Sequence, residues 1–127
     1  MSRRLRSTPL VRPLILCIED DPVYLTLRKK VLEQNGYNVI GVTSADEALK
    51  TLSEIPVCAT VADHMLQGTT GTKLAQEMKR IKPDVPVILF SGTLPENLNG
   101  VDVYVNKGEP LSEFLRILGE VVERFCA

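Results

Sequence analysis

Aromatic side chains and histidine are scarce in this chain of 127 residues. It has no tryptophan, three tyrosines, three phenylalanines and a single histidine, His64. One histidine without a second nitrogen or sulfur ligand is a poor site for zinc or a similar metal. Hydrophobic residues still make up 44% of the chain, so a sizeable core can form, and its side chains must be mostly aliphatic.

Cysteine is also sparse. The three cysteines, Cys17, Cys58 and Cys126, form no CxxC pair, and their odd number argues against a disulfide framework. Cys17 and Cys58 lie in apolar runs and are interpreted as small core residues, whereas Cys126 is expected to be an exposed thiol. Free cysteines of this kind predict a reducing compartment, and we expect a cytoplasmic protein.

Long apolar runs and a strong net charge are missing. No run approaches the length of a membrane span, and Leu14–Ile18 is too short for a signal peptide, so no membrane insertion is expected. Residues 1–12 carry four arginines and no acid, and we expect them to be a disordered, solvated extension. The remaining 11 basic and 16 acidic residues give residues 13–127 a net charge of −5. This single domain is not expected to bind nucleic acid directly.

Short apolar runs alternate with helical patterns along the chain. The five runs are LILCI (14–18), NVIGV (38–42), VCATVA (57–62), VPVILF (85–90) and VDVYV (101–105). The first, third and fourth are nearly all apolar, which is typical of strands buried on both faces. Strands that alternate with helices at this spacing predict a doubly wound parallel sheet.

The first helix has clear end signals. Asp21 is a predicted N-cap, and Pro22 occupies the first helical position. Tyr24, Leu27 and Val31 recur behind them at helical spacing, and Gly36 is a plausible C-terminal stop.

Ionisable and hydroxyl side chains follow the predicted strands. The first strand ends at Glu19-Asp20-Asp21, the third at Asp63, the fourth at Ser91 and the fifth at Lys107. The carboxyl ends of parallel strands meet at one edge of the sheet, where sites of this fold class form. Carboxylates gathered there favour Mg²⁺, and the hydroxyl and ammonium groups suit phosphoryl oxygens.

Four segments in this order, IEDDP, VADHMLQGTTG, ILFSG and YVNKGEP, resemble the receiver domain of two-component response regulators. The resemblance covers roughly residues 13–125 and implies a flavodoxin-like five-stranded sheet of order 2-1-3-4-5. It implies that Asp63 is the phosphoacceptor, which takes a phosphoryl group from a phosphohistidine donor. It further implies that Glu19, Asp20, Asp63 and the backbone carbonyl of Met65 hold Mg²⁺.

The resemblance assigns roles to three further residues. Lys107 matches the family's lysine, Ser91 the hydroxyl that binds a phosphoryl oxygen, and Tyr104 the aromatic residue that turns inward with it. Such a domain is a signalling module and not an enzyme, apart from its own phosphorylation and slow self-dephosphorylation. Its expected partners are a sensor histidine kinase or a histidine phosphotransfer protein, and a downstream protein reached by direct contact.

One departure from the family pattern affects the output surface. Only sixteen positions separate Ser91 from Lys107, and the segment GTLPENLNG (92–100) is too short and interrupted for an ordinary fourth helix. Helix 4 is therefore expected to be short or missing. The usual dimer through helix 4, strand 5 and helix 5 is not expected either.

Alternatives remain open at the level of the sequence. Asp20 and Asp63 can be cap or loop residues, Tyr104 can be a packing residue, and His64 is interpreted as a solvent-facing loop residue. A pseudo-receiver that binds partners without phosphorylation is the first functional alternative. An Asp-nucleophile phosphatase of the haloacid dehalogenase type is disfavoured, because it expects two aspartates two positions apart after the first strand.

Overall fold

The computed structural model describes residues 12–126; residues 1–11 and 127 lie outside the described part. Five parallel strands form one sheet in the order β2-β1-β3-β6-β7. The strands are β1 (Leu14–Ile18), β2 (Asn38–Val42), β3 (Ala59–Asp63), β6 (Val87–Ser91) and β7 (Val103–Asn106). The helices are α1 (Pro22–Gln34), α2 (Ala45–Glu54), α3 (Gly71–Ile81) and α4 (Leu111–Phe125). This is the predicted flavodoxin-like order, 2-1-3-4-5 among the long strands.

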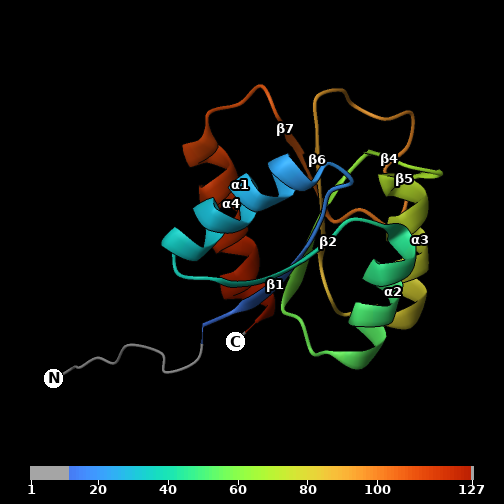
Figure 1. Cartoon of the computed structure of the whole chain (residues 1–127), viewed down its shortest axis with the longest axis horizontal. Helices are drawn as coiled ribbons and strands as arrows, with labels where there is room; N and C mark the ends of the chain where they lie inside the picture. Colours follow the sequence, from blue (N-terminus) through green and yellow to red (C-terminus); the bar gives the residue numbers. More distant parts are fainter. Residues whose placement is uncertain (1–11, 127) are drawn as a thin grey trace, which may run out of the picture.

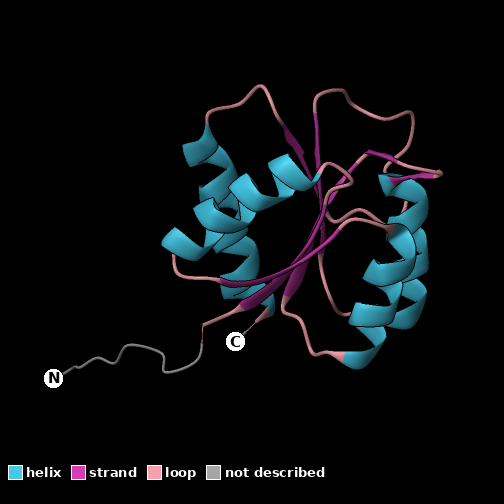
Figure 2. Cartoon of the chain, viewed as in Figure 1, coloured by secondary structure: helices cyan, strands magenta, loops and turns pink. Residues whose placement is uncertain are grey.

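The helices cover both faces of the sheet, with α1 and α4 on one side and α2 and α3 on the other (Figures 1 and 2). Successive side chains of a strand point to opposite faces, so β1 contributes to two separate cores. Ile15 and Cys17 pack in the cluster that includes Leu118 of α4. Leu16 and Ile18 pack in the cluster on the α2 and α3 side. This explains why the strand is apolar at nearly every position.

Three strands end on residues that matter for the site. β3, β6 and β7 run to Asp63, Ser91 and Asn106, each one residue beyond its predicted apolar run. Asp63 and Ser91 are therefore the last residues of buried strands, and both are themselves buried. Their backbones are held by hydrogen bonding within the sheet, so each side chain starts from a fixed position.

The predicted ends of α1 are confirmed, but its predicted apolar stripe faces the wrong way. Asp21 caps the helix, with its Oδ1 accepting a hydrogen bond from the backbone N–H of Val23 at 2.9 Å. Tyr24 and Leu27 are more than half exposed. The inward side of α1 is instead the row that contains Leu25, Arg28 and the fully buried Leu32.

The segment between β6 and β7 contains no helix anywhere in residues 92–102, as predicted. The returning chain is anchored at its end by Asp102. Its Oδ2 accepts a hydrogen bond from the backbone N–H of Val87 at 2.7 Å and pairs with Lys79 Nζ of α3 at 2.5 Å. A short antiparallel hairpin, β4 (Met65–Leu66) with β5 (Thr69–Thr70), follows β3 and was not predicted.

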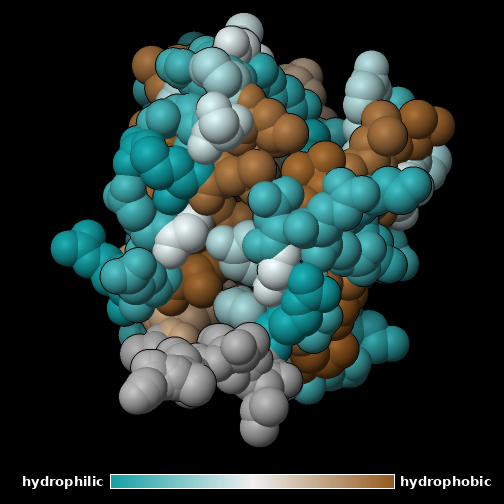
Figure 3. Space-filling model, turned by 90° about the vertical axis from the view of Figure 1, so that its left-hand side faces the viewer, coloured by the Kyte–Doolittle hydropathy of each residue, from teal (hydrophilic) through white to brown (hydrophobic). Residues whose placement is uncertain are grey.

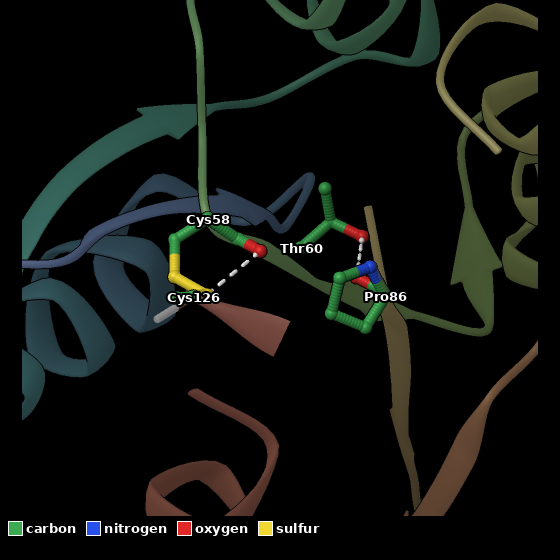
Figure 4. Close-up of a disulfide and its surroundings, with 4 residues drawn as sticks. All are labelled: Cys58, Thr60, Pro86 and Cys126. Carbon is green, nitrogen blue, oxygen red and sulfur yellow. Dashed lines mark hydrogen bonds between the residues drawn. A yellow bond between two sulfur atoms is a disulfide. The ribbon is translucent and has the colours of Figure 1, made fainter. Parts of the chain in front are cut away.

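The interpretation of Cys58 and Cys126 as free thiols is wrong. The two residues form a disulfide, with their Cα atoms 5.6 Å apart (Figure 4). Cys126 is the C-cap of α4 and Cys58 directly precedes β3, so packing of α4 brings together residues separated by 68 positions. Cys17 is the free cysteine of the described part and is buried, as expected. The argument from free cysteines to a reducing compartment therefore loses its basis.

Two further observations concern the ends and the surface. Arg12, the last residue of the basic N-terminal segment, donates a hydrogen bond from Nη2 to the carbonyl of Glu33 at 2.8 Å. The rest of that segment lies outside the described residues. None of the helices in residues 12–126 is long and apolar enough to cross a membrane.

Candidate functional site

An acidic pair and a lysine meet at the carboxyl edge of the sheet, near the loops that follow β6 and β7 at the top of Figure 1. Glu19 follows β1 and Asp63 ends β3, and these two strands are neighbours. Both carboxylate side chains are only 5% exposed. Lys107 follows β7 and reaches back, with its Nζ 2.8 Å from Asp63 Oδ1 and 3.9 Å from Glu19 Oε1. The cluster lies where strand order reverses around β1.

Arg28 brings a second cation to the same carboxylates. From the inward side of α1, its Nη2 lies 3.3 Å from Glu19 Oε1 and its Nη1 lies 3.6 Å from Asp63 Oδ1. Its guanidinium carbon lies 4.9 Å from the centre of the Phe90 ring, which also lies 5.7 Å from Lys107 Nζ. The Phe90 ring thus makes cation–π interactions with both Arg28 and Lys107, which stabilise their positive charges.

The position of Asp63 depends on the close approach of α3. The backbone N–H of Gly71, the first residue of α3, donates to the carbonyl of His64 at 2.6 Å. A Cβ on Gly71 would lie 2.2 Å from the carbonyl oxygen of Asp63 and 2.6 Å from Leu89. Glycine is therefore required here because the backbones of β3 and α3 nearly touch.

Burial and neighbouring charge act on the acids of the first strand end. The pKa of Glu19 lies above its ordinary value, first because the carboxyl is desolvated and then because it contacts the Asp63 carboxyl. The pKa of Asp20 is also raised, by desolvation and by the adjacent Glu19. A cation placed among these groups would relieve the repulsion between them.

Ser91 and Tyr104 are in contact with each other through the backbone. The Ser91 hydroxyl donates to the carbonyl of Thr93 at 2.9 Å, so it is turned toward its own loop. The Tyr104 hydroxyl donates to the Ser91 carbonyl at 3.3 Å and accepts from the Asn106 side chain at 3.1 Å. The two residues predicted to act as a switch are therefore joined by the hydrogen bond from the Tyr104 hydroxyl to the Ser91 carbonyl.

An open cavity of about 220 Å³ adjoins the acceptor. Asp63, His64, Met65, Ser91 and Lys107 contribute to its lining. His64 is partly buried, and its Nδ1 is shielded from solvent without a hydrogen-bond partner in residues 12–126. The Met65 side chain is 73% exposed, which leaves only its backbone for a role inside the site.

The predicted ligands are oxygen donors and fit Mg²⁺ chemically, although the side chains of Glu19, Asp20 and Asp63 do not converge on one common position. Asp63 Oδ1 is buried and paired with Lys107 Nζ at 2.8 Å, and it has no further partner among the described residues, so one lone pair remains available to a cation. No group of three histidine, cysteine, aspartate or glutamate side chains in residues 12–126 forms a metal site. Mg²⁺ commonly uses one or two carboxylates and keeps waters or phosphate oxygens, which such a site allows.

A comparison with known protein families places this arrangement in context. The response regulator receiver domain matches residues 15–107. The chain therefore belongs to the response regulator receiver domain family of two-component systems.

Two curated relatives are much longer than this chain. The transcriptional regulatory protein GlrR of Escherichia coli (strain K12) is 30% identical over 84 residues, which cover 65% of this chain and 19% of GlrR. The transcriptional regulatory protein CssR of Bacillus subtilis (strain 168) is 36% identical over 77 residues, which cover 61% of this chain and 34% of CssR. The chain thus spans about a third or less of these relatives.

Solved structures agree on the fold. The response regulator protein TrrA from Thermotoga maritima, in complex with Mg²⁺–BeF, is 25% identical with a TM-score of 0.80, covering 86% of this chain and 98% of TrrA. A CheY-like receiver domain from Methanospirillum hungatei has a TM-score of 0.83 at 23% identity, covering 90% and 96%. The second likeness concerns the fold alone.

Arg28 and Phe90 are the site residues that sequence reasoning missed. A signal for Arg28 was present, since it lies three positions after Leu25 and four before Leu32 and so shares a helix face with them. The more regular apolar stripe, which contains Tyr24 and Leu27, instead predicts that the opposite side of α1 faces inward. Phe90 lies in a predicted strand, and no sequence pattern distinguishes an aromatic residue of the core from one that contacts cations.

Proposed function

We propose that this chain is a phosphoacceptor receiver domain in which Asp63 takes a phosphoryl group from a phosphohistidine. A carboxylate oxygen of Asp63 attacks phosphorus, the new O–P bond forms, and the N–P bond of the donor breaks, leaving the donor imidazole. The observation that carries the proposal is the buried Asp63 carboxylate paired with Lys107 Nζ at 2.8 Å beside an open cavity lined by Ser91. Phosphoryl transfer depends mainly on positioning and on neutralising charge.

The residues of the site divide this work. Lys107 pairs with Asp63 and orients its carboxylate before attack, and then offers its ammonium to a phosphoryl oxygen. Bound Mg²⁺, held by Glu19, Asp20, Asp63 and the carbonyl of Met65, would supply further positive charge for the phosphoryl oxygens. The same neutralisation favours later attack by water on the acyl phosphate, so slow self-dephosphorylation is part of the proposal.

The output is a shift between two conformations. The Ser91 hydroxyl leaves the Thr93 carbonyl and binds a phosphoryl oxygen of modified Asp63. Because Tyr104 is hydrogen-bonded to the backbone of Ser91, a change at Ser91 alters the position that Tyr104 prefers. The phosphoryl group then shifts the population toward the conformation in which Ser91 and Tyr104 have moved, because it binds that conformation more strongly.

The proposed donor is a sensor histidine kinase or a histidine phosphotransfer protein. An apolar surface at the start of α1, made of Val23, Tyr24 and Leu27, is 55–66% exposed and begins two residues after Asp21. Figure 3, which views the side of α1 and α4, shows apolar side chains gathered on that face. Exposed apolar patches of this kind are suited to protein contact. The proposed downstream partner is a protein reached by direct contact.

Intact mass after incubation with acetyl phosphate and MgCl₂ tests this function. Wild type should gain one phosphate, the gain should require Mg²⁺, and Asp63→Asn should abolish it. Beryllofluoride, the group bound with Mg²⁺ in the TrrA complex, should change the tyrosine spectrum of the wild type through Tyr104. It should leave the spectrum of Asp63→Asn unchanged. A wild type that forms no adduct and ignores beryllofluoride would instead be a pseudo-receiver. Steady turnover of many phosphoesters would indicate a phosphatase.

A further inference from the structure

Arg28 occupies a position that hydrophobic packing would ordinarily fill. It lies on the inward row of α1 between Leu25 and the fully buried Leu32. Its side chain is only 10% exposed, and Nη1 is shielded from solvent with no hydrogen-bond partner in residues 12–126. A buried arginine is costly unless its charge is matched, so the groups that face it explain its presence.

Two carboxylates and one aromatic ring face the Arg28 guanidinium. The planar fork directs Nη2 to Glu19 and Nη1 to Asp63, at 3.3 and 3.6 Å. The ring of Phe90 covers it and stacks in turn on Phe114, with ring centres 4.7 Å apart. The arginine is thus held in place by packing from below and by opposite charge at its tip.

At the acceptor, the charges of the two buried carboxylates are balanced by two protein cations without any bound ion, and Asp20, beside Glu19, adds one further negative charge. The buried carboxylates Glu19 and Asp63 carry two negative charges, and Arg28 and Lys107 carry two positive charges within 4 Å of them. A divalent cation entering this cluster meets carboxylates that are already neutralised, and is repelled by two neighbouring cations. Its net electrostatic gain is therefore smaller than at an acidic pair without Arg28.

We propose that Arg28 is an internal counter-ion of the acceptor carboxylates, which weakens the binding of Mg²⁺ to the unphosphorylated protein. The inference rests on the proposed function only in taking this cluster as the Mg²⁺ site. Arg28 acts through Glu19 and Asp63 as a positioning residue. The incoming phosphoryl group brings new negative charge, so the competition between Arg28 and Mg²⁺ relaxes when a phosphodonor is bound.

Calorimetric titration of the metal-free full chain with MgCl₂ at fixed ionic strength tests the inference. Arg28→Met should bind Mg²⁺ about ten-fold more tightly than wild type or better, since one nearby cation is removed. Arg28→Gln, which keeps a polar amide of similar length, should change the affinity in the same direction. Lys29→Met is the matched control, because it removes the same charge from an exposed neighbour on α1 and should leave the affinity unchanged.

Thermal unfolding with and without MgCl₂ supplies a second readout and verifies that each variant folds. The upward shift in Tm caused by Mg²⁺ should be larger for Arg28→Met than for wild type, as tighter binding requires. Mg²⁺ affinity that is equal, weaker or undetectable in both Arg28 variants would overturn the inference. An equal gain in Lys29→Met would do the same, because it would reduce the effect to net charge.

The acetyl phosphate experiment on wild type at saturating MgCl₂ separates this inference from the proposed function. A wild type that is phosphorylated while Arg28→Met shows no gain in Mg²⁺ affinity refutes the counter-ion and leaves the function standing. An Arg28→Met that gains affinity while no chain is phosphorylated refutes the function and leaves the counter-ion standing.

Discussion

At the acceptor, burial requires that each charged side chain has a partner of opposite charge. Asp63 is a carboxylate with 5% exposure, and leaving such a group unpaired costs several kcal/mol. Lys107 and Arg28 supply the pairing from two different elements, Lys107 from the loop after β7 and Arg28 from α1. A substitution of Lys107 would therefore lower the stability of the fold as well as the rate of phosphorylation, so both quantities have to be measured.

The thiol of Cys17 provides a test of this buried region. Burial raises the pKa of Cys17 to about 11 from an ordinary 9.0, against the opposing effect of nearby Arg28. At pH 8 and without reductant, the folded chain should contain no thiol that reacts with a chromogenic disulfide reagent, and one should appear on unfolding in urea. Because the unfolded thiol ionises first, Cys17 should reduce stability as pH rises from about 9 to 11. Cys17→Ala should lack that decline, and rapid reaction of the native chain would contradict the burial.

Gly71 offers a second test at the residue scale. Gly71→Ala places a Cβ 2.2 Å from the Asp63 carbonyl, and we expect the free energy of unfolding to fall by about 1–3 kcal/mol. Urea denaturation measures this change. Gly92→Ala is the control, since an added Cβ there meets nothing within 4 Å. Equal stability of the two variants would show that α3 does not approach β3 so closely.

Capping residues determine where the helices begin and end, and this holds independently of which helix face is apolar. α1 begins at a capped Asp21-Pro22 step and ends before Gly36, whose φ of +99° suits glycine at a helix stop. α2 begins at Ala45 after the N-cap Ser44, whose Oγ accepts a hydrogen bond from the Glu47 backbone N–H at 3.2 Å. These local contacts give the helices their bounds even where, as in α1, the outward face is apolar.

The role of Asp21 belongs to this scale. We expect Asp21→Ala to lower the free energy of unfolding by about 1 kcal/mol, because the N-cap of α1 is lost. Phosphorylation of Asp63 by acetyl phosphate should persist in the variant, since Asp21 is assigned to structure. Asp84→Ala, which removes an exposed loop carboxylate, is the control for charge. A variant that keeps its stability but loses the phosphate adduct would instead give Asp21 a role in the site.

The link between α4 and β3 is a further element-scale feature. Cys126→Ser should lower the free energy of unfolding by about 2–4 kcal/mol, because the unfolded chain is no longer closed into a long loop. Cys58→Ser and the reduced wild type should show the same loss in denaturant melts. Unequal losses in the two single variants would indicate that packing of one cysteine, and not the link, carries the effect.

The whole molecule has one edge devoted to the acceptor and an altered surface beside β7. Residues 92–102 return to the sheet without a helix, so the surface usually formed by helix 4 is absent from this part of the chain. The disulfide (Figure 4) joins the end of α4 to the residue before β3, and Asp63 lies at the opposite end of that strand. It therefore secures α4 without touching the acceptor edge.

This shape predicts the assembly state. We expect the chain to remain monomeric after activation with beryllofluoride and MgCl₂, because the surface for the usual dimer is incomplete. Light scattering behind size-exclusion chromatography measures this directly, with Asp63→Asn as the unactivated reference. A dimer that forms only in the activated wild type would show that β7 and α4 suffice for association.

Much of the fold was predictable from local pattern. β1 and β2 match their predicted runs, and the missing helix follows from the short, interrupted segment after Ser91. The candidate acceptor could be found because parallel strands deliver their last residues to one edge, a rule that needs only strand ends. Local pattern failed on α1, where the more regular apolar stripe is the exposed one.

By itself, the sequence determined the strand ends and the helix caps, because each depends on neighbours within a few residues. The rule that parallel strands end at one edge then predicted that acids, hydroxyl and lysine gather there. Only the tertiary structure decided which face of α1 packs inward, and hence that Arg28 reaches Glu19 and Asp63. It likewise decided the pairing of Cys58 with Cys126 across 68 positions. Such contacts arise from the packing of layers, which no local pattern encodes.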